Sequence, residues 1–272
     1  MPKRLVLQKL LTAPIAAAIV ESGSDQVGGY VAAASAAASL RTPAELLAAY
    51  VVDGSPQFID VVRFEQPWLA TLSMPDDRQR PWQTFPNGFL LGDSLAQVWA
   101  LGRTRYSYGA EYWRIRADGE QKCLSRYEGA ARGWVGAQGW RPPSPMVGTL
   151  ARWQDHEFFA DVLPESVLLT AITDDGPAGF EQIHSRVWSA TVPISECEVF
   201  EKVFTAELEG VPVRLLRSMG RTAEVLLLSD EPSDAERVGA GLVEPGVYEV
   251  IVDAGRLTNV QGLENQLAPT NG

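Results

Sequence analysis

The stretch "GVYEVIVDAGRLTNV" runs from Gly246 to Val260 and, taken alone, indicates an ordinary β-strand followed by a turn. Sixty residues earlier the chain reads "RVWSATVPISECEVF", Arg186 to Phe200. The shared spacing indicates that one module was used twice in the C-terminal half. The matched positions are Val187 with Val247, Trp188 with Tyr248, Val192 with Val252, and Cys197 with Leu257.

The correspondence extends upstream of this pair. "ARWQDHEFFADVLPESVLLTA" (151–171) and "AELEGVPVRLLRSMGRTAEVLLLS" (206–229) each read as strand, turn and strand, and we match the Val-Leu-Leu of 167–169 with that of 225–227. The alternative is that any two β-rich segments with similar turn spacing look alike. Since a unit of about 55 residues buries too little surface to be stable alone, two copies are expected to pack together. We expect a duplicated small β-rich, partly closed barrel-like module at 149–202 and 203–262, with a C-terminal tail at 263–272.

The "RPPSP" run marks a Pro-rich linker at 141–148, before which we expect an α+β domain at 1–140. This domain should combine a helical N-terminal segment with an antiparallel sheet. An apolar face of Leu5, Leu7, Leu10, Leu11 and Ile15 predicts an amphipathic first helix, and 32–40 an Ala-rich second one. Thr42, Pro43 and Glu45 form a helix-start signal.

Strands are expected later in this domain. "QFIDVVRF" (57–64) reads as a strand, and Asn87-Gly88 as a tight turn. Residues 111–129 predict a hairpin with a two-residue type I′ turn at Asp118-Gly119. "GFLLGDSLAQVWALG" (88–102) reads as a helix capped by Asp93 or Ser94.

The composition limits the classes of function. A net charge of −11 argues against general nucleic-acid binding and favours a basic protein partner. Two cysteines and two histidines, far apart in sequence, offer no zinc-site spacing, so no metal or cofactor is expected. The first residues imitate a signal peptide, but Gln8, Lys9 and Pro14 interrupt the apolar run, so we expect a cytoplasmic protein with no membrane contact. No nucleophile elbow or phosphate loop is present in the sequence, so no catalytic residue is proposed.

Two clusters are candidate partner-binding sites. The first, at 102–116, mixes arginines with tyrosines: Arg103, Arg105, Tyr106, Tyr108, Tyr112 and Arg114. It fits a structural sheet face, a protein interface, or a nucleotide site with Glu111 and Glu128 as acid-base groups. The second is acidic, at Asp230, Glu231, Asp234 and Glu236. It fits the first turn of a short helix, or a loop that docks a basic surface.

"AELEGVPVRLLR" and "VLLLSDEPSDAERVGAGLVEPGVYEVIV" resemble actinobacterial immunity proteins that partner NAD-hydrolysing toxins of the tuberculosis-necrotizing-toxin type. The resemblance covers about 203–260 and carries no catalytic residue. It implies a non-enzymatic antitoxin whose loop occludes the toxin's cofactor cleft, and therefore a secreted toxin with a basic surface as partner. The alternatives are a nucleotide- or small-ligand-handling enzyme using the cluster at 103–116, and an accessory protein or chaperone of a secretion system.

Overall fold

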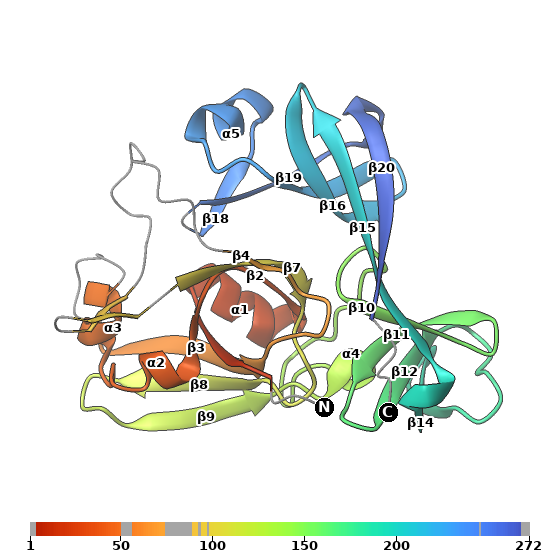
Figure 1. The fold of residues 1–272 in the computed structure, drawn as a ribbon, viewed down its shortest axis with the longest axis horizontal. Helices are drawn as coiled ribbons and strands as arrows, with labels where there is room; N and C mark the ends of the chain where they lie inside the picture. The colour runs from red at the N-terminus through yellow and green to blue at the C-terminus, as the bar shows by residue number, and fades with distance from the viewer. Residues whose placement is uncertain are drawn as a thin grey trace. The chain divides into compact units, whose positions relative to one another are not determined.

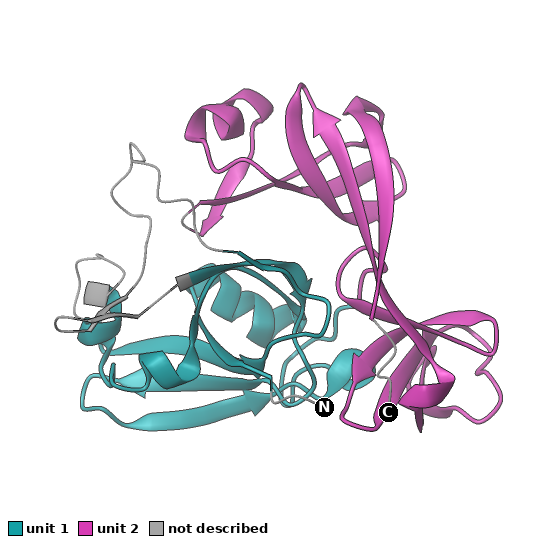
Figure 2. Ribbon diagram, viewed as in Figure 1, with its two compact units in different colours: residues 1–141 teal, residues 142–272 magenta. Residues whose placement is uncertain are grey.

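The computed structural model describes residues 4–49, 56–73, 89–91, 94–96, 98–244 and 246–267. The chain divides into two compact units, unit 1 at Met1–Arg141 and unit 2 at Pro142–Gly272 (Figure 2). The division falls between Arg141 and Pro142, the first two residues of the expected Pro-rich linker. Both units are built mainly from antiparallel sheet, with few helices, which agrees with the α+β expectation (Figure 1).

Unit 1 contains a seven-stranded sheet in the order β4-β7-β2-β1-β3-β8-β9. Its strands are β1 (Val6–Leu10), β2 (Gln26–Ala33), β3 (Phe58–Glu65), β4 (Leu72–Ser73), β7 (Val98–Arg105), β8 (Glu111–Arg116) and β9 (Gln121–Arg126). A separate hairpin joins β5 (Phe89–Leu91) to β6 (Ser94–Ala96). The helices are α1 (Ala13–Ser22), α2 (Ala34–Ala37), α3 (Pro43–Ala49) and α4 (Gly129–Arg132).

Apolar clusters cover both faces of this sheet. Ile19 of α1 packs with Leu7 and Val62 on one face, and Leu46 of α3 packs with Val61 and Ile115 on the other. A strand buried on both faces needs no alternation of apolar and polar residues.

The expected first helix over Leu5 to Ile15 is therefore wrong. Leu7 and Leu10 lie in β1, a central strand whose short apolar run cannot be told from a helix by periodicity. Pro14 lies in the first turn of α1, where its missing N–H costs no hydrogen bond. The Ala-rich stretch is likewise divided, since β2 extends to Ala33 before the single turn of α2 begins.

Other expectations in unit 1 fare differently. The helix-start signal is confirmed: Glu45 N–H donates to Thr42 Oγ1 at 3.3 Å, and Thr42 N–H donates to Glu45 Oε2 at 2.9 Å. The helix expected within 88–102 is wrong, because β5, β6 and β7 occupy this stretch. The Asn87-Gly88 turn lies outside the described residues.

The hairpin of β8 and β9 forms as expected, with a longer turn. Gly119 N–H donates to the Arg116 carbonyl, and Arg116 N–H to the Glu120 carbonyl, so the loop has three residues. Only Gly119 takes a positive φ, of 87°, whereas a type I′ turn would need Asp118 there too. Trp113 and Ile115 share one face, as expected, in the cluster that α3 covers.

Unit 2 is one sheet of antiparallel strands in the order β13-β14-β12-β11-β10-β15-β16-β17-β19-β18, with β20 paired to β15. We call 149–203 segment 1 and 204–266 segment 2. Segment 1 holds β10 (Thr149–Trp153), β11 (His156–Val162), β12 (Ser166–Ile172), β13 (Glu181–His184), β14 (Val187–Pro193) and the 3₁₀ turn η1 (Ile194–Glu196). Segment 2 holds β16 (Val211–Met219), β17 (Thr222–Leu227), α5 (Pro232–Val238), β18 (Gly241–Glu244), β19 (Val247–Asp253), η2 (Ala254–Arg256) and β20 (Leu257–Gln266). The long strand β15 (Glu198–Leu208) ends the first segment and begins the second.

The two segments have the same pairing plan. β13 pairs with β14 through Gln182↔Trp188 and His184↔Val187, with an irregularity between them. β18 pairs with β19 through Leu242↔Tyr248 and Glu244↔Val247, with the same irregularity sixty residues later. The first hairpins also agree, because the ladders Leu150↔Phe159 to Trp153↔His156 and Thr205↔Arg214 to Leu208↔Val211 differ by a constant 55 residues.

Two details of the expected alignment change. Val167 pairs with Val192 and Ala223 pairs with Val252, so the Val-Leu-Leu of 167–169 corresponds to 223–225 and not to 225–227. Residues 263–266, expected in a C-terminal tail, form the last part of β20. The sheet is open in the part of the chain that the structure describes, since β13 and β18 lie at its ends.

Candidate functional site

The Arg/Tyr cluster is divided between the core and the surface of unit 1. Arg105 is 4% exposed, and Tyr106 and Tyr112 are each 2% exposed, so these three offer no surface to a partner. Their expected role in partner binding is corrected accordingly. Arg103 on β7 is half-buried and Tyr108 is exposed.

Tyr106 lies at the centre of an aromatic cluster. Its ring stands edge-on to Phe64 at a centroid distance of 5.3 Å and to Trp134 at 5.1 Å. Tyr127 packs against the same Trp134 at 5.4 Å. Edge-to-face pairs of this kind add stability beyond the area they bury, so this part of the cluster is structural.

Tyr112 and Arg114 meet at Asp60, which is 7% exposed on β3. The Tyr112 hydroxyl donates to Asp60 Oδ2 at 2.7 Å, while Arg114 donates through Nε to Oδ1 at 2.8 Å and through a terminal nitrogen to Oδ2 at 2.9 Å. Burial, and then the bond to Asp60, raises the pKa of Tyr112. Arg114 also lies 3.7 Å over the ring of Phe58. A buried carboxylate with a two-point arginine contact is a satisfied structural group.

Glu111, which was suggested as an acid-base group, also has hydrogen-bond partners within unit 1. Glu111 accepts from Trp113 Nε1 at 3.1 Å and from Arg126 at 2.5 Å. Its suggested companion Glu128 stands before α4 as the N-cap residue, without a side-chain capping bond. These contacts favour the structural interpretation of the cluster over the ligand-site interpretation.

The acidic tract lies at helix α5 in segment 2. Asp234 accepts from Ser229 Oγ and from Arg237, both at 2.6 Å, so it holds the first turn of the helix. Glu231 is the N-cap residue, and Glu231 and Glu236 are exposed, while Asp230 is half-buried. The exposed members of the tract are therefore Glu231 and Glu236.

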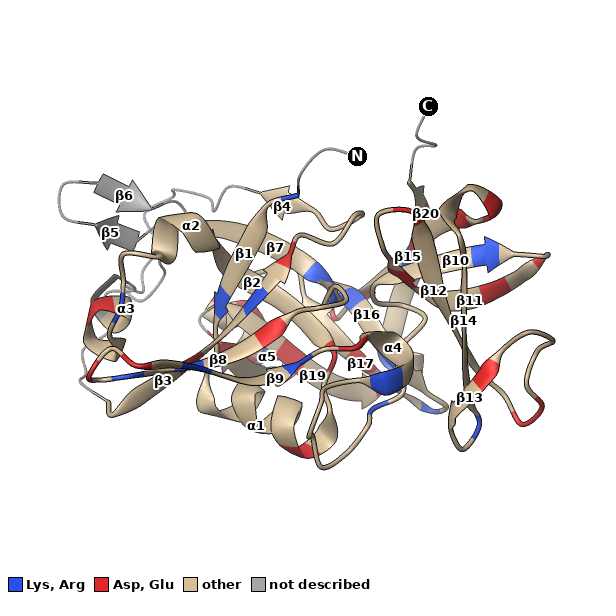
Figure 3. Ribbon diagram, turned by 90° about the horizontal axis from the view of Figure 1, so that it is seen from below, with Lys and Arg blue, Asp and Glu red and all other residues tan. Residues whose placement is uncertain are grey.

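Charge is distributed unequally between the two units. In the full sequence, unit 2 contains 21 Asp and Glu against 8 Lys and Arg, whereas unit 1 contains 13 against 15. Figure 3 marks the charged residues along the ribbon. The net negative charge of the protein is thus a property of unit 2 alone. A surface of one sign speeds encounter with an oppositely charged partner, especially at low salt.

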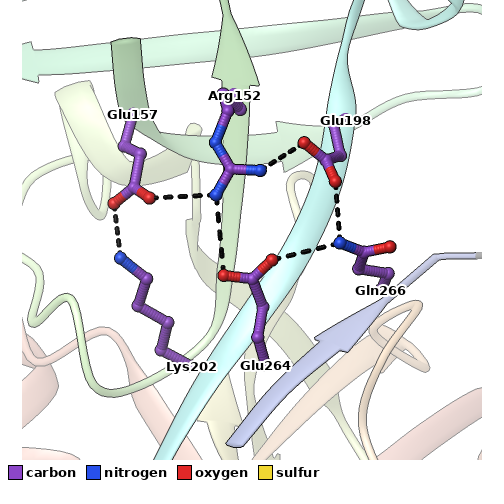
Figure 4. A network of polar contacts seen from close by, with 6 residues as sticks. All are labelled: Arg152, Glu157, Glu198, Lys202, Glu264 and Gln266. Carbon is purple, nitrogen blue, oxygen red and sulfur yellow. Dashed lines mark hydrogen bonds and ion pairs between the residues drawn. The ribbon is translucent and has the colours of Figure 1, made fainter. Parts of the chain in front are cut away.

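One charged network on unit 2 was not anticipated from the sequence. Arg152 on β10 bonds to Glu198 and lies 3.2 Å from Glu157 and 3.6 Å from Glu264 (Figure 4). Its guanidinium also stands 4.8 Å over the ring of Phe200. Glu157 also accepts from Lys202 at 2.5 Å, which lowers its pKa. Gln266 donates to Glu198 at 2.7 Å. These residues come from four strands, and only the pairing of β20 with β15 brings the last of them into place.

A groove of about 490 Å³ opens between the ends of β11 and β12 in segment 1. The β11–β12 ladder stops at Phe159↔Thr170, whereas the equivalent ladder continues to Val213↔Leu227, followed by a bond from Leu228 N–H to the Pro212 carbonyl. The groove lies where these strands separate. Its lining includes His156, Phe158, Thr170, Asp175 and Pro177.

Segment 2 carries a helix after the equivalent strand. Ala235 and Val238 of α5 share an apolar cluster with Val211 and Val213. Segment 1 has no helix at this point, and Phe180 packs instead on Phe158 at a centroid distance of 5.1 Å. The two segments therefore present different surfaces on one strand plan.

The remaining candidate chemistry is limited. Within the described residues, no three His, Cys, Asp or Glu side chains are grouped as a metal site would require. Cys123 and Cys197 are free thiols, and burial raises the pKa of Cys197 to about 11, which leaves it little thiolate at neutral pH. None of the helices formed by the described residues has both the length and the apolarity to cross a bilayer.

Comparison of this chain with protein-family models, with curated proteins and with solved structures finds no match.

Proposed function

We propose that this chain is a non-enzymatic, cytoplasmic binding protein that neutralises a basic protein partner, as an immunity protein neutralises its toxin. The observation that carries the proposal is the charge of unit 2, which has 21 acidic against 8 basic residues on an antiparallel sheet. The resemblance of 203–260 to immunity proteins of NAD-hydrolysing toxins supports the kind of partner. Affinity would come from surface complementarity at unit 2 and not from chemistry on the partner.

We propose further that segments 1 and 2 arose by duplication of one small, partly closed barrel-like unit. The support is the repeated irregularity between β13 and β14 and between β18 and β19, together with the constant offset of the first hairpins. Duplication gives one copy freedom to change its surface while the other keeps the fold. The groove in segment 1 and helix α5 in segment 2 are such differences.

Co-expression with a toxin tests the proposal. The catalytic domain of an NAD-hydrolysing toxin of this type is expressed in a bacterial host with and without the chain, and cellular NAD is measured. We expect NAD to be retained only when the chain is present, and the two proteins to purify together. Depletion of NAD at an equal rate, with no complex formed, would sink the proposal.

Charge reversal identifies the surface. Glu231→Lys with Glu236→Lys changes two exposed residues without touching Asp234, which holds α5. We expect association at low salt to slow by about tenfold. The control is Glu21→Lys with Glu120→Lys, two exposed acidic residues of unit 1, which should leave the rate nearly unchanged.

A further inference from the structure

The outer edge of β20 pairs with no other strand among the residues that the structure describes. Both segments end in a strand that follows a 3₁₀ turn, β15 after η1 and β20 after η2. The first part of β15 pairs on one side with β10 and on the other with β20, from Phe200↔Gln266 to Val203↔Leu263. β20 pairs with β15 on one side, and none of the described strands pairs with its other side.

The hydrogen-bond register shows which backbone groups face outward. Leu267 donates its N–H to the Val199 carbonyl at 2.8 Å. Since neighbouring residues of an antiparallel strand point their backbone groups to opposite sides, residues 263 and 265 face β15. The N–H and C=O groups of residues 262, 264 and 266 therefore face away from the sheet.

This edge has few of the features that normally block strand addition. β20 is ten residues long, and a bulge with Asn259 at φ 51° interrupts its register between Thr258 and Gln261, so its regular part is 261–266. Most of its side chains are exposed, among them Val260 at 56% and Leu263 at 62%. Glu264 is its single charged residue. Native edges are usually short, bulged, or carry several charges or a proline.

We propose that the outer edge of β20 binds an extended, basic segment of a partner protein as an additional antiparallel strand. The equivalent edge of β15 shows the form of the occupant, because β20 itself lies there as an antiparallel strand. The charge of unit 2 selects a basic segment and disfavours a second copy of this acidic chain. The inference deepens the proposed function, since it names the part of unit 2 that binds.

Two synthetic peptides serve as probes. One has ten residues alternating lysine with valine and threonine, and the other has glutamate in place of lysine. Binding to the full chain is measured by fluorescence anisotropy at low salt, and amide hydrogen exchange is followed at β20. We expect the lysine peptide to bind at least tenfold more tightly than the glutamate peptide and to slow exchange at residues 262, 264 and 266 by at least tenfold.

A pair of variants separates the backbone from the side chain. Glu264→Pro removes an outward N–H while leaving the bonds to β15, and Glu264→Ala removes the same carboxylate but keeps the N–H. Both lose the contact with Arg152, and urea denaturation of the two variants measures any further effect of proline on stability. We expect Glu264→Pro to weaken binding of the lysine peptide at least tenfold and Glu264→Ala less than threefold.

Several results would overturn the inference. These are equal binding of the two peptides, equal binding by the two variants, or unchanged exchange at the outward amides. Dimerisation in sedimentation that Glu264→Pro abolishes would show that a second copy occupies the edge. If the toxin binds wild type and Glu264→Pro equally, the edge proposal fails while the proposed function stands. If the lysine peptide binds but the toxin does not, the proposed function fails while the edge proposal stands.

Discussion

Asp60 shows at the scale of one residue why an Arg/Tyr-rich sequence is ambiguous. Interleaved tyrosines and arginines are typical of binding surfaces, yet here Tyr112 and Arg114 point to a buried carboxylate that comes from a strand fifty residues earlier. The sequence "QFIDVVRF" predicts the strand but not which neighbour it pairs with. Asp60 and Arg114 are paired only by the tertiary contact of β3 with β8, and the local sequence around either residue contains no information about that contact.

Substitutions at this site should reveal its structural role. We expect Tyr112→Phe to lower the free energy of unfolding by about 1 kcal/mol and Asp60→Ala by about 3 kcal/mol, because the second leaves a half-buried guanidinium without its carboxylate. Arg116→Ala, which removes an exposed ion pair with Glu120, should cost less than about 0.5 kcal/mol. Urea denaturation measures all three, and an Asp60→Ala protein as stable as Arg116→Ala would contradict the assignment.

The pH dependence of the same pair follows from the raised pKa of Tyr112. A folded-state pKa above the ordinary value of 10.0 means that the folded chain holds the phenol proton more tightly than the unfolded chain. The extra stability of wild type over Tyr112→Phe should therefore be complete below pH 10 and shrink as the pH rises above it. Paired denaturation curves at pH 8 and pH 10.5 would show this, and a constant difference would argue against it.

At the scale of elements, the sequence predicts a helix cap and the position of a hairpin better than it predicts the turn type or separates buried strands from helices. The capping box at Thr42 and Glu45 is local chemistry and is confirmed in its atoms. The β1 strand was expected to be a helix, because a strand covered on both faces loses the alternation that identifies it. The similar spacing of β14 and β19 could be predicted, because apolar residues occupy the same positions in both strands. The charged network at Arg152 could not be predicted, because Glu198 and Glu264 reach Arg152 only through long-range strand pairing, although Glu157 lies opposite it in a short hairpin.

The first hairpin turns of the two segments offer an element-scale test. Gln154 and Asp155 have φ of 49° and 64°, and Glu209 and Gly210 have 51° and 79°, so both turns need left-handed backbone. We expect Asp155→Gly to raise the free energy of unfolding by about 0.5 kcal/mol and Gly210→Ala to lower it by about 1 kcal/mol, since a Cβ is disfavoured in this conformation. No atom lies within 4 Å of the position a Cβ at Gly210 would take, so the effect measures backbone strain and not a clash. Thermal and urea unfolding of the two variants check the opposite signs, and changes of the same sign would refute the explanation.

At the scale of the whole molecule, the two units differ in electrical character and in plan. Unit 1 is a sheet with apolar clusters on both faces and a nearly balanced charge, as a structural body would be. Unit 2 carries the excess acid, the groove and the open edge of β20. If the proposed function is right, unit 2 is therefore the part of the chain in which we expect the binding surface.

Strand β15, which belongs to both segments, gives a prediction about how cooperatively unit 2 unfolds. Since β15 pairs with β10, β16 and β20, the fragment 142–272 should unfold in a single cooperative transition. The fragment 142–203, which keeps segment 1 but loses segment 2, should be unfolded, because it buries too small a fraction of its surface. Circular dichroism and calorimetry distinguish these outcomes, and two separate transitions in 142–272 would show that the segments are independent.

A strand that closes one segment and opens the next also restricts how such a chain can change length over generations. A deletion that ends inside β15 removes part of segment 1 and part of segment 2 at once. Only the gain or loss of a complete segment therefore leaves every strand with its partner. A strand added beside β20 would take the side that no described strand occupies, as β20 itself lies beside β15.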